Sequence, residues 1–191
     1  MKRILVYGVT GSGKTLLAQR IGECLGLPVH LVDELTWEPG WMQVPGDEQR
    51  RRIEAICAGE RWVLDSAYGA WLDVPLARVE LIVALDYPRL LSFGRLLRRS
   101  LNRARDRHPV CNGNIETWRL MLSRDSILLW HFKSFRRKRE RIRHWEATLP
   151  PEKVVRLTHP RQVDPWLESV AGKLPAHGEQ PGNPVPHHHV G

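Results

Sequence analysis

The clearest candidate for chemistry is a glycine-rich stretch near the N-terminus. Residues 8–15 read GVTGSGKT, which matches the pattern GxxxxGK[ST] at every position. Glycines let backbone N–H groups curl around an anion, and the N-terminus of a following helix adds partial positive charge. We expect Lys14 to reach the β- and γ-phosphates of ATP or GTP and the Thr15 hydroxyl to ligate Mg²⁺. The predicted nucleotide-binding residues are Gly8, Val9, Thr10, Gly11, Ser12, Gly13, Lys14 and Thr15.

Two aspartates follow apolar runs that have the character of strands. Asp65 follows residues 61–64, and it could hold a water of a Mg²⁺ shell. The alternatives for Asp65 are a cap on the next helix or a pair with Arg78. Asp33 follows residues 29–32, and it could orient or deprotonate an acceptor hydroxyl. A helix cap or an arginine partner explains Asp33 equally well at this stage.

The positive charge is concentrated in one segment. The chain carries 29 basic and 21 acidic residues, a net charge of +8. Residues 89–143 hold 16 of the basic and 4 of the acidic ones, a net charge of +12, so the rest of the chain has a net charge of −4. Such a segment favours phosphate-bearing partners. Arg95 and Arg99 share one helix face at spacing i, i+4, so the pair could bind phosphate or belong to a solvated basic face.

The run at residues 136–143 allows two interpretations. It can be part of a basic lid that faces nucleotide phosphates, or a patch for RNA or DNA. Four consecutive basic residues on a helix point all round it, so we expect most of them to be solvated, with mild affinity for polyanions.

The elements needed to position these residues can be read from apolar periodicity. Residues 2–7, 29–32, 61–64, 80–85 and 153–157 read as strands. Helices are expected at residues 14–25, 47–58, 88–101, 116–145 and from 160 to about 173, with a loop at 102–114.

The pattern predicts an α/β fold, in which helices sandwich a five-stranded parallel sheet. Ligands bind beyond the carboxyl ends of such strands, where the glycine-rich loop and the aspartates would meet. Asp86, at the end of the fourth strand, is expected to cap the helix that begins at Pro88.

Length and composition exclude several classes of protein. A chain of 191 residues with 42% hydrophobic residues can form one ordinary domain. We expect no membrane span and no export signal, because the apolar runs are short. Three scattered cysteines indicate reduced thiols and a cytoplasmic location. The proline-, glycine- and histidine-rich residues 174–191 are expected to be a disordered tail.

The sequence resembles the adenylate kinase-related P-loop kinases, in particular the subgroup of small bacterial proteins labelled DNA topology modulation protein. Beyond the phosphate loop, the resemblance rests on DELTW at 33–37, GERWVLD at 59–65, LDYPR at 85–89 and GNIETW at 113–118. It covers residues 2 to about 173. It implies a five-stranded core, an acceptor region after the second strand, a mobile basic lid at about 102–130, and roles at the nucleotide for Arg95 and Arg99. Relatives carry Asp-Gly-Asn-Tyr after the third strand, whereas this chain has Asp65-Ser66-Ala67-Tyr68.

Together these features predict a kinase with one domain over residues 1–173, which uses ATP and Mg²⁺. The expected catalytic residues are Lys14, Asp33, Arg95 and Arg99, and the expected metal ligands are Thr15 and Asp65. The acceptor is expected to be a small molecule, with a nucleoside or nucleotide among the candidates. A nucleic-acid-associated NTPase and a regulatory nucleotide-binding module are the alternatives. The sequence does not specify an oligomeric state.

Overall fold

The computed structural model describes residues 1–107, 109–121, 123 and 126–172. Its centre is a parallel sheet in the order β2-β5-β1-β6-β9. The strands are β1 (Arg3–Gly8), β2 (Val29–His30), β5 (Trp62–Leu64), β6 (Leu81–Leu85) and β9 (Val154–Leu157). The predicted five-stranded parallel sheet is confirmed, and β1, which leads into the phosphate loop, lies between β5 and β6. The predicted tail at 174–191 lies outside the described residues.

The strands are apolar along their whole length because helices cover both faces of the sheet. On one face Leu5 and Tyr7 of β1 contact a core that includes Ile142 of the long helix α7. On the other face Ile4 and Val6 contact a core that includes helix α1. Successive residues of a strand point to opposite faces, so β1 contributes to both cores.

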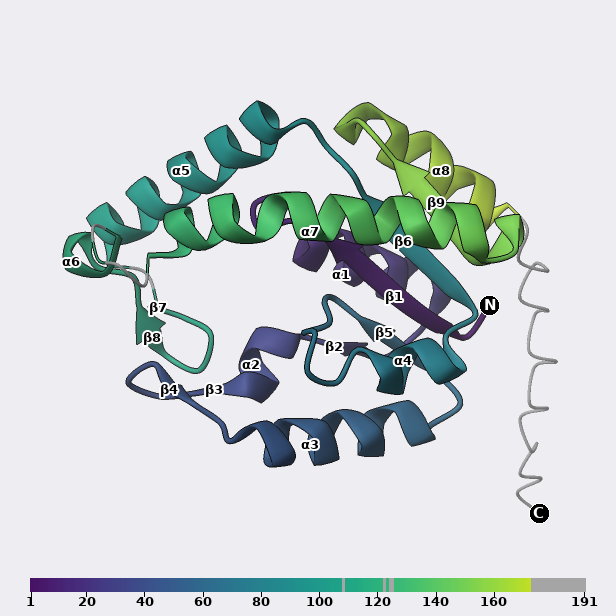
Figure 1. Ribbon diagram of the computed structural model, residues 1–191, viewed down its shortest axis with the longest axis horizontal. Coiled ribbons are helices and arrows are strands. Elements are labelled where there is room, and N and C mark those ends of the chain that lie inside the picture. Colours follow the sequence, from purple (N-terminus) through teal and green to yellow (C-terminus); the bar gives the residue numbers. More distant parts are fainter. Residues whose placement is uncertain (108, 122, 124–125, 173–191) are drawn as a thin grey trace, which may run out of the picture.

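Figure 1 shows the helical layers around the sheet and α7 crossing in front of it. Residues from α3, α4 and α7 form the core on one face, and residues from α1 and α8 form the core on the other. The helices are α1 (Lys14–Leu25), α2 (Val32–Thr36), α3 (Gly46–Ala58), α4 (Asp73–Arg78), α5 (Arg89–Asp106), α6 (Trp118–Met121), α7 (Ile127–Thr148) and α8 (Val163–Ala171), with 3-10 turns at Pro151–Lys153 and Pro160–Gln162.

The second predicted strand is shorter than expected. Residues 29–32 were expected to be extended, but β2 ends at His30 and α2 begins at Val32. The carboxylate of Asp65 accepts a hydrogen bond from the Val32 N–H at 2.8 Å. Because that N–H is one of the unpaired donors of a helix N-terminus, the contact stabilises helix at this point. A hairpin of β3 (Trp37–Glu38) and β4 (Met42–Gln43) follows α2.

The basic segment also differs from the expected loop and helix bounds. Helix α5 continues to Asp106 and ends at Arg107, which has a positive φ of 47°, so residues 102–106 are not loop. A hairpin of β7 (Pro109–Val110) and β8 (Asn114–Ile115) follows. Helix α7 starts after Ser126, whose hydroxyl accepts a hydrogen bond from the Leu128 N–H, rather than at residue 116. Among the described residues, the stretch expected to be the lid, about 102–130, therefore includes the end of α5, this hairpin, α6 and the first turn of α7.

None of the helices among the described residues is both long and apolar enough to cross a membrane.

Candidate phosphate-transfer site

The glycine-rich loop connects the central strand to α1 and has the backbone shape that anion binding needs. Gly11 and Gly13 have φ values of 82° and 94°, a conformation that side-chain-bearing residues rarely adopt. A Cβ on Gly11 would lie 2.4 Å from the Ser92 carbonyl oxygen of α5. The Ser12 hydroxyl donates to the Val9 carbonyl at 2.8 Å. The loop is thus closed on itself and seated against α5, with its exit at the N-terminus of α1.

Lys14 is half-buried at the start of α1, and its ammonium donates to the Val9 carbonyl at 3.1 Å. Burial lowers the pKa of Lys14, and the nearby carboxylates of Asp65 and Asp33 oppose this effect. A carbonyl is a neutral acceptor, so the charge of Lys14 is solvated poorly in this position. An anion such as a nucleotide phosphate would supply the missing partner.

Thr15 and Asp65 meet beside Lys14. The Thr15 hydroxyl donates to Asp65 Oδ2 at 2.7 Å, while Asp65 Oδ1 accepts from Val32 N. Burial raises the pKa of the Asp65 carboxyl, although both hydrogen bonds lower it. Of the alternatives for Asp65, the pairing with Arg78 does not occur, since that guanidinium donates to the Ala58 carbonyl. Asp65 does cap a helix, but the helix is α2 rather than the next one.

The paired oxygens of Thr15 and Asp65 fit Mg²⁺, which prefers hard oxygen ligands and keeps several waters. Within the described ranges, no group of three or more histidine, cysteine or acidic side chains could hold a metal alone. A cation at this pair would therefore need nucleotide phosphates and waters to complete its shell.

Asp33 lies on the first turn of α2. The sequence pattern had suggested instead that it lies at the end of a strand. Its exposed carboxylate accepts a hydrogen bond from the Tyr68 hydroxyl at 2.7 Å. Burial and the nearby Asp33 charge raise the pKa of Tyr68, so the phenol stays a donor. Neither a helix cap nor an ion pair with arginine accounts for Asp33, because α2 has no side-chain cap and the described contact is with Tyr68. The carboxylate also lies close enough to Lys14 and Arg99 to oppose the lowering of both pKa values by burial.

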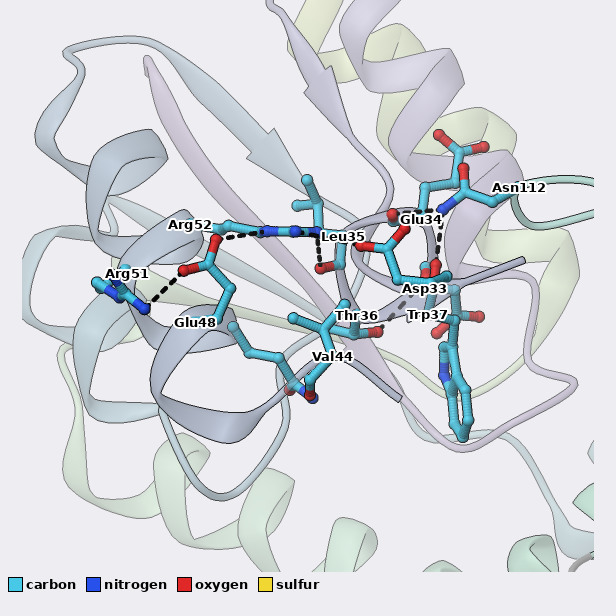
Figure 2. A network of polar contacts seen from close by, with 12 residues as sticks. Asp33, Glu34, Leu35, Thr36, Trp37, Val44, Glu48, Arg51, Arg52 and Asn112 are labelled. Atoms are coloured by element: carbon cyan, nitrogen blue, oxygen red, sulfur yellow. Dashed lines mark hydrogen bonds and ion pairs between the residues drawn. The ribbon is translucent and has the colours of Figure 1, made fainter. Parts of the chain in front are cut away.

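The segment that carries Asp33 is held from two sides, as Figure 2 shows. From α3, Arg52 donates to the Leu35 carbonyl at 3.1 Å and pairs with Glu48. From the β7–β8 hairpin, the Asn112 amide donates to the carbonyls of Glu34 at 2.8 Å and Trp37 at 2.7 Å. The hairpin of the expected lid therefore lies directly on the segment expected to bind the acceptor.

Arg95 and Arg99 share a helix face, but their side chains lie in different surroundings. Arg95 lines a cavity of about 340 Å³ beside Gly13, Tyr87 and the 3-10 turn Pro160–Gln162. Arg99 is half-buried, and its Nε has no hydrogen-bond partner within the described structure. Burial lowers the pKa of Arg99, and Arg103 adds to the effect, while Glu116 and Asp33 oppose it. Arg95 is thus placed beside the phosphate loop, and Arg99 on the side of Asp33.

Two residues of α7 that sequence reasoning did not assign to the site also contact the phosphate loop. Lys138 donates to the Gly8 carbonyl at 3.2 Å, and His131 Nδ1 lies 3.0 Å from the Thr10 carbonyl. Most of the run at 136–143 was expected to be solvated, and Lys138 was not separated from it, which is wrong for this residue. A signal was available, because Lys138 falls at helical spacing with the buried Phe135, Ile142 and Trp145.

Asp86 does not cap α5, which corrects the sequence-based expectation. The N-cap of that helix is Pro88, without a side-chain hydrogen bond. The fully buried Asp86 carboxylate instead accepts from Arg139 of α7 at 2.6 Å and from Arg156 of β9 at 3.1 Å. The contact joins α7 to the sheet next to the strand that leads into α5. Asp86 therefore has a structural role that no local pattern could have indicated.

Searches of protein-family models and of curated proteins found no match for this sequence. Solved structures with a similar fold include a gluconokinase from Sinorhizobium meliloti 1021, with 17% sequence identity and a TM-score of 0.50 over 90% of this chain and 94% of that chain. A shikimate kinase from Bacteroides thetaiotaomicron has 18% identity and a TM-score of 0.51 over 90% of this chain and 96% of that chain. Likeness at this level of identity concerns the fold, so the chain has the fold of these kinases.

Proposed function

We propose that this protein binds ATP with Mg²⁺ and transfers the γ-phosphoryl group to a hydroxyl of a small acceptor. The observation that carries the proposal is the convergence of Lys14, Asp65 and Asp33 at one edge of the sheet, where their charges influence one another. Phosphoryl transfer needs mainly positioning and neutralisation of charge, and this arrangement offers both. The two kinases that share the fold add support.

In this proposal the nucleotide lies along the phosphate loop. The backbone N–H groups of residues 8–13 and the N-terminus of α1 bind the phosphates. The base and ribose occupy the cavity beside Gly13, Tyr87 and Arg95, because it adjoins the loop. Thr15 and Asp65 would hold Mg²⁺, which supplies charge neutralisation on the β- and γ-phosphates when bound.

The reaction itself takes place between the loop and α2. The acceptor hydroxyl oxygen forms a bond to the γ-phosphorus, the bond from that phosphorus to the β–γ bridging oxygen breaks, and ADP leaves. Asp33, oriented by Tyr68, accepts the hydroxyl proton. Lys14 and Arg99 stabilise the negative charge on the transferring group.

The choice of acceptor is part of the proposal. The structural relatives are named as kinases of gluconate and shikimate, so small hydroxylated compounds head the candidates, with a nucleoside or nucleotide placed after them. The relation to the DNA topology modulation subgroup stays a proposal, based on the sequence motifs alone. Three free cysteines support the proposed cytoplasmic location.

The alternative of a nucleic-acid-associated NTPase receives less support from the basic segment. Several of its cations are engaged within the protein, since Arg103 pairs with Glu116, Arg136 pairs with Glu140, and Arg139 pairs with Asp86. Cations held in this way contribute less to a surface for polynucleotides.

A coupled ADP-release assay tests the proposal. The protein is incubated with ATP and Mg²⁺ and a panel of sugars, sugar acids, cyclic hydroxy acids, nucleosides and nucleotides, and separately with DNA or RNA. We expect release that depends on one class of small hydroxyl acceptor and disappears in Lys14→Ala. Release that depends on polynucleotide would favour the alternative, and no ATP binding by the wild-type protein would refute both.

A further inference from the structure

Three consecutive carbonyls of the phosphate loop each contact a basic side chain. Gly8 accepts from Lys138 at 3.2 Å, and Val9 accepts from Lys14 at 3.1 Å. The Thr10 carbonyl lies 3.0 Å from Nδ1 of His131, which must carry the proton because a carbonyl only accepts. Lys138 and His131 come from α7, seven residues apart and so two turns along one face of the helix. This long helix therefore brings its own basic groups to the back of the loop.

Lys138 lies in surroundings that do not suit a cation without an anion. It is partly buried, and its hydrogen bond is to a neutral carbonyl. Its one aromatic contact within the described residues is a long cation–π contact with the Tyr7 ring at 5.7 Å, which does not replace an anion. The charged groups that act on it are Lys14 of α1, Arg137 and Arg141 of α7, and Asp33 of α2. Three of these four are cations. Burial, followed by repulsion from Lys14, lowers the pKa of Lys138 to about 7.

The ammonium groups of Lys14 and Lys138 donate to adjacent carbonyls of the phosphate loop, those of Val9 and Gly8. A third cation, Arg99, lies on the Asp33 side of the same site, and its Nε has no hydrogen-bond partner among the residues that the structure describes. Like charges so close together in a poorly solvated site raise the free energy of the nucleotide-free protein. A multiply charged anion removes this repulsion, and the terminal phosphate of ATP is such an anion.

We propose that Lys138 is a second catalytic lysine, which together with Lys14 binds the γ-phosphoryl group of ATP during its transfer. The inference rests on the proposed function, because it takes ATP as the ligand of the loop. It assigns to α7 a direct part in the reaction, in addition to its packing on the sheet. Lys138 moves from the Gly8 carbonyl to the phosphate oxygens when the nucleotide arrives, and it binds them as a full cation.

This role has a consequence that can be measured without an acceptor. Because the pKa of Lys138 is lowered to about 7, part of the Lys138 side chains are unprotonated at pH 7.5. A neighbouring phosphate raises the pKa of this group, so binding completes its protonation and takes up protons from solution. A Lys138 variant should lose this proton uptake if Lys138 binds the phosphate. It should not lose it if Lys138 only holds the Gly8 carbonyl.

The experiment measures binding of a non-hydrolysable ATP analogue and of ADP by isothermal titration calorimetry at pH 7.5. Each titration is run with Mg²⁺ in two buffers of different ionisation enthalpy, which gives the number of protons taken up. The variant is Lys138→Met, which keeps the length and apolar stem of the side chain. Lys133→Met is the matched control, since Lys133 lies on the exposed side of α7.

We expect wild type and Lys133→Met to take up more protons than Lys138→Met when the analogue binds, with a difference of less than one proton per site. Affinity of Lys138→Met for the analogue should fall by about tenfold or more, while affinity for ADP should change less than twofold, since ADP lacks the γ-phosphate. Equal losses for ADP and the analogue, or unchanged proton uptake, would show that Lys138 only supports the loop and would overturn the inference alone. A wild-type protein that binds neither nucleotide would overturn the proposed function as well. Circular dichroism of each variant confirms that the affinities refer to folded protein.

Discussion

The Asp65→Asn substitution separates a metal role from a structural role at the edge of the sheet. Asp65 accepts two hydrogen bonds, from the Val32 N–H at 2.8 Å and from the Thr15 hydroxyl at 2.7 Å. Asparagine keeps the shape of the side chain. Its oxygen can accept from Val32, and its amide can donate to the Thr15 hydroxyl, which can also accept. The substitution thus removes the charge and leaves the local hydrogen bonds in place.

The magnitude follows from what the carboxylate would do for Mg²⁺. Loss of a group that orients the shell of a metal weakens metal binding by about 10- to 100-fold, or about 1.4 to 2.7 kcal/mol. We expect Asp65→Asn to lose this much affinity for the ATP analogue with Mg²⁺. In the absence of Mg²⁺, the affinity of Asp65→Asn for the ATP analogue should stay the same or rise slightly, because a negative charge near the phosphates has been removed. Titration calorimetry with Mg²⁺ and with EDTA gives both values.

Stability provides the control for this prediction. Burial raises the pKa of Asp65 above its usual 3.8, so the folded state binds more protons than the unfolded state just above that pH. The unfolding free energy of the wild type therefore contains a contribution that falls as pH rises from 3.8 through the raised pKa, and Asp65→Asn lacks it. Urea unfolding at pH 7 should find Asp65→Asn no less stable than wild type. Asp65→Ala, which leaves the buried Val32 N–H without a partner, should cost about 2 kcal/mol or more. If Asp65→Asn lost equal affinity with and without Mg²⁺, the metal role would be refuted.

Further substitutions test other parts of the site. Lys14→Ala should abolish ADP release, because the lysine neutralises the transferring group. The circular dichroism spectrum should stay unchanged, because burial disfavours the charge of Lys14 in the folded protein. Wild-type turnover in this variant would exclude the loop as the catalytic site. Arg99→Ala should lower kcat by about 10²-fold or more. Arg95→Ala should mainly raise KM for ATP, since Arg95 lines the cavity beside the loop. Steady-state kinetics distinguish these two outcomes, and the same change of kcat and KM in both variants would contradict the separate placement of the two arginines. Asp86→Ala leaves Arg139 and Arg156 without their buried partner and should lower the unfolding free energy by about 3 kcal/mol; an unchanged urea midpoint would mean that the triad does not stabilise the fold.

The sequence by itself determined the central sheet and the nucleotide loop. Apolar runs without alternation indicate strands buried on both faces, and each of the five predicted runs overlaps one of the five observed parallel strands. The phosphate loop is a local motif, because residues 8–15 are contiguous and the positive φ angles that the loop needs are adopted by its own glycines. Asp65 was placed near Thr15 by a topological rule, since adjacent parallel strands end at the same edge.

The tertiary structure decided which charged residues reach this edge and which do not. Asp33 stands on a helix rather than at a strand end, because α2 begins where Asp65, distant in sequence, caps it. Lys138 reaches the loop while Arg136 stays exposed and pairs with Glu140, although both belong to one basic run. The amino-acid composition of the run does not distinguish these neighbours, whereas the orientation of α7 on the sheet turns Lys138 towards the loop and Arg136 towards solvent. The burial of Asp86 between Arg139 and Arg156 depends on three elements that meet only in the fold, so no local pattern contains it.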